Sequence, residues 1–285
     1  MLDIGGPIRV TDYGGDGPLI LLVHGLGGST ENWDVAGPLL MEHGNVVALD
    51  LVGFGESIPG DRRPSVEENG RVVAEVIDAL GFETATLVGN SMGGLVSMIA
   101  GVEHASRVDR LVLVNPALPV SRRHPPDLEV LTKLIGPLVP GIGVPAFRVY
   151  RAAHSPEEET AETLRMVTAD WETVPEWARE GLTNANRRRR SHDWAIPSFL
   201  EADRSIARYV LRPRRFTRLI HKISAPTLLV HGSEDRLVSV DSARWAAEQR
   251  PDWSYREMEG VGHVPMLEAA DWFVDLVTTW LDSSA

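Results

Sequence analysis

The chain has 285 residues, of which 43% are hydrophobic and 24% are charged, so a large buried core is expected and disordered or collagen-like classes are excluded. The formal net charge of -12 argues against a broad surface for nucleic acids or anionic membranes, and the absence of cysteine excludes disulfides and thiolate metal sites. We expect a cytoplasmic protein without membrane insertion, because no apolar run reaches the ~18 residues of a spanning helix and the N-terminus lacks a signal-peptide pattern.

Continuous apolar runs of strand length recur along the chain. The first is LILLV at Leu19–Val23, and later runs end in Asp50, Asn90 and Asn115, while another begins at Thr227. Runs of this kind suit strands that are buried on both faces of a parallel sheet.

Helical patterns follow these runs. Ser65 and Glu68 form a capping box before an amphipathic stripe that Gly81 ends, and residues 273–280 repeat the stripe near the C-terminus. Alternating strand and helix patterns predict an α/β fold.

The alternation stops over residues 116–223, where helical patterns follow one another without a strand signal. Helix starts are expected at Ser155, Thr173 and Ser198. We predict a core domain of residues 1–115 and 224–285, with residues 116–223 inserted as a helical cap at the strand ends where α/β sheets bind ligands. The arginine run 187–190 within this cap is interpreted as a solvated helical face.

The stretch GNSMG, from Gly89 to Gly93, fits the pattern G-x-S-x-G between a strand and a helix. A sharp strand-to-helix turn exposes its central residue and needs small neighbours, because the backbones approach closely. The helix that follows directs amide N–H groups at developing negative charge. A plain turn is the alternative, but the strand–turn–helix context favours Ser91 as a nucleophile.

A serine nucleophile needs a base, and the base needs an acid to orient it. His263 lies on a glycine-flanked loop before the final helix, and Asp235 follows the strand that begins at Thr227. Glu234 is the adjacent competitor for the acid. The other position for an acid, after the preceding strand, holds Asn115, whose amide cannot carry the negative charge.

The loop HGLGG suits a backbone site for an oxyanion. We expect the N–H groups of Leu26 and Met92 to form this oxyanion hole, with His24 bracing the loop and His231 also structural. No metal or nucleotide cofactor is expected, since the sequence has no H-E-x-x-H motif, Rossmann fingerprint or P-loop.

Together, HGLGG, DLVGFGES, GNSMGG, HGSEDRLV and GVGHVP resemble the α/β-hydrolase family over nearly the whole chain. The resemblance implies a mostly parallel central sheet flanked by helices, an inserted helical cap, and a triad of Ser91, Asp235 and His263. Serine at the elbow disfavours haloalkane dehalogenases and epoxide hydrolases, which use aspartate there.

The elbow is also similar to that of meta-cleavage-product C–C hydrolases, but those enzymes typically carry tryptophan after the catalytic histidine, where this chain has Val264, and a different oxyanion loop. The resemblance therefore implies a serine hydrolase, most simply a carboxylesterase, that acts on a small-molecule ester of small to medium size. The alternatives are a C–C hydrolase, a cofactor-free perhydrolase, and a non-catalytic ligand-binding member of the fold. No nucleic-acid partner is expected, and nothing in the sequence indicates an oligomeric state.

Overall fold

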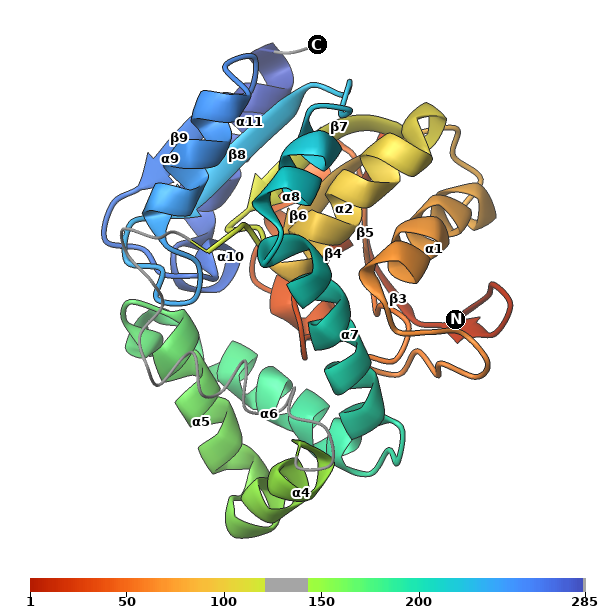
Figure 1. Ribbon diagram of the computed structural model, residues 1–285, viewed down its shortest axis with the longest axis vertical. Coiled ribbons are helices and arrows are strands. Elements are labelled where there is room, and N and C mark those ends of the chain that lie inside the picture. The colour runs from red at the N-terminus through yellow and green to blue at the C-terminus, as the bar shows by residue number, and fades with distance from the viewer. Residues whose placement is uncertain (121–142, 284–285) are drawn as a thin grey trace.

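The computed structural model describes residues 1–120 and 143–283, and Figure 1 shows a central sheet covered by helices, with further helices beyond one end of it. The sheet order is β3-β5-β4-β6-β7-β8-β9, and only the pairing of β3 with β5 is antiparallel. The strands are β3 (Val10–Gly14), β4 (Leu19–Val23), β5 (Asn45–Leu49), β6 (Ala85–Asn90), β7 (Val108–Val114), β8 (Thr227–Gly232) and β9 (Ser254–Met258). The predicted α/β fold with a mostly parallel sheet is confirmed.

The N-terminal strands were not expected from the sequence. A separate two-stranded sheet joins β1 (Leu2–Asp3) to β2 (Pro7–Ile8), and β3 lies at the edge of the main sheet. The sequence of β3, VTDYG, is polar and only half-buried, because this edge strand pairs on one side alone. It therefore lacks the apolar run that marks the inner strands.

Side chains of the inner strands alternate between two apolar cores. On β4, Leu19, Leu21 and Val23 join the core formed with helices α1 (Val66–Ala79) and α2 (Met92–Glu103), while Ile20 and Leu22 join the core on the opposite face with α11 (Ala270–Ser283). Burial of each such side chain contributes about 1.5–3 kcal/mol, and two-sided burial explains why the strand has no polar residue.

Helices and 3-10 turns cover both faces of the sheet. The helices of this layer are α1 (Val66–Ala79), α2 (Met92–Glu103), α9 (Val240–Gln249), α10 (Pro265–Glu268) and α11 (Ala270–Ser283), with 3-10 turns η1 (Thr30–Trp33), η2 (Pro38–His43) and η3 (Ala105–Arg107). As predicted, the Ser65 side chain caps α1 by accepting the N–H of Glu68, and Gly81 follows the helix end with a positive φ.

Between β7 and β8 the described residues form helices, which we call the inserted helices. They are α4 (Gly143–Ala153), α5 (Pro156–Val167), α6 (Glu176–Arg190), α7 (Ala195–Val210) and α8 (Pro213–Ile220), with the 3-10 turn η5 (Trp171–Thr173). In Figure 1, α4 to α6 lie beyond one end of the sheet, α7 runs from them to the core, and α8 lies back against the core beside α2. The division of the chain at residues 116–223 stays a prediction, and residues 121–142 of the predicted cap lie outside the described residues.

Two predicted helix starts are wrong. Helix α5 does begin after Ser155, which forms a complete capping box, but α6 begins after Pro175, because Thr173 belongs to η5. Helix α7 begins at Ala195, so Ser198 lies inside its first turn and packs against the loop at Gly53 instead of capping. No helix within residues 1–120 and 143–283 is long and apolar enough to span a bilayer.

Helix α7 carries a buried carboxylate that has no hydrogen-bond partner among the described residues. Asp203 is 6% exposed, and its Oδ2 atom is buried without a partner. Burial raises the pKa of Asp203 to about 7, against a smaller lowering by Arg204. Folding therefore favours the protonated form of this side chain, so its contribution to stability is greatest at low pH and is lost as the pH rises to about 7.

We accordingly expect the Asp203→Asn variant to gain stability relative to the wild type as the pH rises. The difference between the two proteins in the free energy of unfolding should change by on the order of 3 kcal/mol between about pH 4 and about pH 8. As the pH rises, the wild type alone must either bury the charged carboxylate of Asp203 or take up a proton on folding. Urea unfolding of both proteins across this range measures the difference. Parallel stability profiles would show that Asp203 titrates normally in the folded chain.

Candidate active site

The residue between β6 and α2 adopts a conformation that is rare outside glycine. Ser91 has φ 56° and ψ -117°, and this backbone is held by its N–H donating to Val114 O at 3.0 Å and by its carbonyl accepting from Gly94 and Ala117. Asn90 and Met92 on either side are buried, whereas Ser91 is partly exposed. The turn thus presents the serine at the carboxyl end of the sheet, with strain typical of a functional site.

The glycines of the elbow permit close backbone contacts. A Cβ atom on Gly93 would lie 2.1 Å from Val23 O, and one on Gly89 would lie 2.5 Å from Gly93 O. A Cβ atom on Gly25 would lie 3.1 Å from Ser91 Cβ. The loop after β4 is therefore pressed against the serine, as the predicted oxyanion hole requires.

His24 braces that loop. Its Nε2 atom accepts the N–H of Leu51 at 3.0 Å, so the proton resides on Nδ1, which donates to Gly25 O at 2.7 Å. Complete burial lowers the pKa of His24 to about 4, which keeps the ring neutral. These contacts agree with the structural role expected for His24 and leave it no free nitrogen for catalysis.

The structure leaves two amide groups free beside Ser91. Among the described residues, neither the N–H of Leu26 nor that of Met92 has a hydrogen-bond partner. Met92 is the first residue of α2, so its N–H also lies at the positive end of the helix dipole. Two unpaired donors at this place can stabilise a developing oxyanion.

The predicted acid and base form a buried pair. His263 Nδ1 lies 2.7 Å from Asp235 Oδ2, and both side chains are almost fully buried. Asp235 Oδ1 accepts the N–H groups of Leu237 and Val238. The competitor Glu234 is exposed.

The environment of Asp235 favours its charged form. Burial alone would raise the pKa of this carboxyl, but the charge and hydrogen bond of His263 and the amide donors hold it below its ordinary value. His231 lies 3.5 Å from the same carboxylate oxygen, and its Nε2 atom lies 2.8 Å from Val238 O, in agreement with a structural role. Asp235 is thus a charged, oriented acceptor for His263.

Two asparagines that the sequence did not assign to the site join its loops. Asn115, at the end of β7 with φ 44°, donates to Asp235 Oδ2 at 2.7 Å. Asn90 donates to the carbonyl of His263 at 3.0 Å, which brings the histidine loop beside Ser91. Within the described residues the Ser91 hydroxyl has no hydrogen-bond partner. The hydrogen bond between a serine nucleophile and its histidine base is often long before substrate binds.

The arginines at the end of α6 form the predicted solvated face only in part, because Arg187 and Arg188 are exposed whereas Arg189 is partly covered. Arg188 pairs with the buried Glu31 of the core, and Arg189 donates to the carbonyl of Gly27 in the loop that carries the predicted oxyanion hole. Arg190 is also largely covered. The partners come from distant segments, so helical periodicity did not reveal these contacts.

The family model described as alpha/beta hydrolase fold matches residues 18–270. The chain belongs to the alpha/beta hydrolase fold family. One relative in this family is the 2-hydroxy-6-oxo-6-(2'-aminophenyl)hexa-2,4-dienoic acid hydrolase of Metapseudomonas resinovorans, which is 27% identical over 284 residues that cover 95% of this chain and 86% of the relative.

Two solved structures share the fold of this chain. A meta-cleavage product hydrolase from Pseudomonas fluorescens IP01 has a TM-score of 0.75 and 22% identity, covering 99% of this chain and 96% of that chain. A thermophilic esterase from Thermogutta terrifontis has a TM-score of 0.71 and 22% identity, covering 97% and 93%. The two structures are thus named as a meta-cleavage product hydrolase and as an esterase, and both share the fold of this chain.

Proposed function

We propose that the chain is a serine hydrolase that cleaves carboxylic esters of small to medium size through an acyl-enzyme intermediate. The observation that carries this proposal is the buried pair of Asp235 and His263, 2.7 Å apart, in a loop tied by Asn90 to the strained turn at Ser91. A nucleophile, a base and an orienting acid are the parts that acyl transfer by serine needs.

The first half-reaction begins at Ser91. Because His263 donates its Nδ1 proton to Asp235, the lone pair of Nε2 is free to accept the serine proton as the hydroxyl oxygen attacks the acyl carbon. The ester carbonyl oxygen becomes negative, and the N–H groups of Leu26 and Met92 stabilise it. Loss of one such donor typically costs about 2.7–4 kcal/mol in the transition state.

The intermediate then breaks toward products. His263, now protonated, gives its proton to the leaving alcohol as the carbon–oxygen bond breaks, and Ser91 keeps the acyl group. A water molecule then gives a proton to His263 and attacks the acyl carbon, and the return of that proton to Ser91 frees the acid. Asp235 stays charged throughout and stabilises the imidazolium that forms twice.

One large apolar residue of the inserted helices is well placed to contact the acyl chain. A Cβ atom on Gly27 would lie 3.2 Å from the ring of Phe199, which also packs against Phe147. Trp194 and Leu200, on the same helix region, instead line a hollow away from this loop. The position of Phe199 therefore supports an apolar wall for the substrate.

Hydrolysis of a C–C bond is the second candidate. It is favoured by the relative from Metapseudomonas resinovorans, whose name specifies a dienoic acid hydrolase. Against it, the residue after His263 is the buried Val264, where such hydrolases typically carry tryptophan. The same serine, histidine and acid would serve either bond.

A substrate screen separates the two candidates. We expect measurable kcat/KM on p-nitrophenyl esters from acetate to dodecanoate, with an optimum at short or medium length. The dependence on chain length follows because an apolar wall rewards each buried methylene by about 0.8 kcal/mol. The kcat/KM on a 2-hydroxy-6-oxo-dienoate should be at least ~100-fold lower than on the preferred ester. The Ser91→Ala variant measures the background rate for every substrate. Faster cleavage of the dienoate than of every ester would replace the ester proposal by the second candidate.

A further inference from the structure

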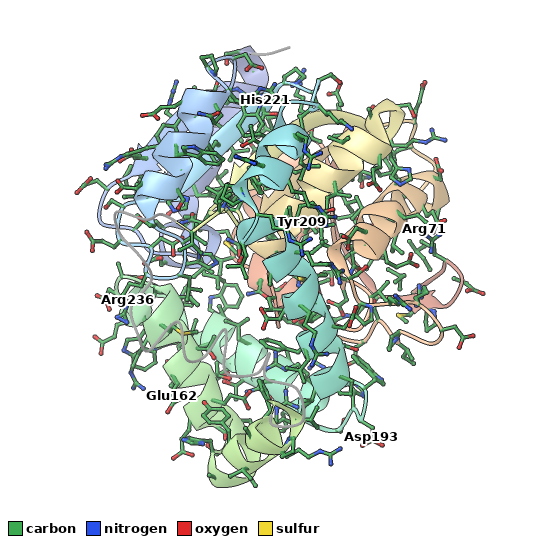
Figure 2. The ribbon with its side chains drawn as sticks, in the orientation of Figure 1. Arg71, Glu162, Asp193, Tyr209, His221 and Arg236 are labelled. Atoms are coloured by element: carbon green, nitrogen blue, oxygen red, sulfur yellow. The ribbon has the colours of Figure 1, made fainter. Side chains whose placement is uncertain are left out.

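The C-terminal end of α5 is fastened directly to the loops that carry the acid and the histidine. The N–H of His263 donates to Val167 O at 2.7 Å. Arg236, the neighbour of Asp235, donates to Arg165 O at 3.1 Å, and Figure 2 places its label beside this end of α5. The inserted helices therefore contact the chemical centre through the backbone, apart from any contact with substrate.

A third connection passes through one carboxylate. Glu268, at the end of α10, accepts the N–H of Gly262 at 2.8 Å with Oε1 and the N–H of Ala169 at 2.9 Å with Oε2. Gly262 precedes His263, and Ala169 lies just beyond α5. One side chain thus joins the histidine loop to the inserted helices.

The contact between these two segments is close. A Cβ atom on Gly262 would lie 2.7 Å from Ala169 N and 2.8 Å from Thr168 Cα, so only glycine fits there without displacement. Glu268 is half-buried, and burial raises its pKa above the ordinary value despite the lowering effect of its amide donors. Loss of the carboxylate would leave the buried Gly262 N–H without an acceptor, at a cost of about 1–3 kcal/mol, while water can replace the bond to the exposed Ala169.

We infer that Glu268 is a positioning residue that holds His263 in place by fastening its loop to the end of α5. The imidazole is then correctly placed only while α5 is docked, so the inserted helices support the chemistry as well as selecting substrates. The kinetic part of this inference rests on the proposed function. A misplacement of about 1 Å in a reacting group can cost on the order of 100-fold in rate.

Two single variants test the connection from its opposite ends. Glu268→Gln keeps the size of the side chain but has one acceptor oxygen in place of two, and Ala169→Pro removes the N–H donor without changing Glu268. Thr168 is extended, with φ -111° and ψ 156°, as the residue before a proline should be. Each variant should lower kcat on p-nitrophenyl acetate by roughly 10- to 100-fold with KM within about threefold.

The double variant and a neighbouring glutamate provide the controls. Because both changes break one connection, the double variant should be no slower than the slower single variant within about threefold. Glu259→Gln alters an exposed glutamate on the segment before His263 and should leave kcat within about twofold. A rise in KM with unchanged kcat in folded Glu268→Gln would overturn the positioning role.

Hydrogen exchange gives a readout that does not depend on the reaction. In Glu268→Gln, which keeps one acceptor oxygen, amide exchange should speed up by at least ~10-fold at Gly262 or at Ala169, while the strands keep wild-type protection. Unchanged exchange at both amides would overturn the inference even if an ester is hydrolysed. If the wild type hydrolyses no ester, the proposed function fails, and the exchange result still decides whether Glu268 joins the two segments.

Discussion

The Ser91→Ala variant is expected to lose on the order of 10⁴- to 10⁶-fold in kcat while keeping its fold. The change removes only the hydroxyl oxygen, and the elbow itself is held by backbone hydrogen bonds to Val114, Gly94 and Ala117, which alanine retains. Steady-state kinetics on the preferred ester, with circular dichroism as the check on folding, measures the effect.

A second serine on the same helix supplies the matched control. Ser97→Ala removes a buried hydroxyl that donates to Gly93 O, so it tests local packing of α2 without touching the nucleophile, and kcat should stay within about tenfold. A fluorophosphonate probe should label Ser91 alone, as mass spectrometry of the digested protein can show. Labelling at another serine, or near-normal turnover in Ser91→Ala, would remove the nucleophile from the proposal.

Asp235→Asn is expected to slow turnover by up to about 10⁴-fold. The amide can still accept the N–H groups of Leu237 and Val238 through its oxygen, so the loop should remain ordered. Its NH₂ group then faces His263 Nδ1 and cannot accept a proton there, which favours the wrong tautomer and removes the charge that stabilises the imidazolium.

The adjacent Glu234→Gln variant is the control for charge at this loop. Glu234 is exposed, so its replacement should change kcat by less than about threefold. Single-turnover kinetics on the two variants separates the chemical step from product release. A large loss in Glu234→Gln together with a small loss in Asp235→Asn would move the acid by one position.

The residues proposed for chemistry could be predicted because each carries a local signal. Ser91 lies among glycines between a strand and a helix, and Asp235 and His263 lie on loops that follow strands. Parallel strands bring such loops to one edge of the sheet, so chain order alone indicates that they lie near one another. The catalytic roles themselves remain predictions until the variants are measured.

The supporting residues could not be predicted in the same way. Asn115 was considered only as an acid and rejected, although its amide supports Asp235 from the end of the neighbouring strand. Arg188 and Glu31 meet from segments far apart in the sequence, and no spacing rule relates them. The start of α7 was missed because Pro197 lies inside its first turn, where a missing N–H costs nothing.

The pairing of β7 with β8 holds the sheet together across the whole insertion, with Leu111 to Val114 in register with Thr227 to Val230. The entropy of closing a loop grows only with the logarithm of its length, by about 0.6 kcal/mol per doubling, so lengthening this segment costs the sheet little. Descendants of such a chain can therefore exchange most of the inserted helices and acquire new substrates. The end of α5 and helix α8 are parts they would have to keep, because α5 is bonded to the loops of Asp235 and His263 and α8 packs against the core.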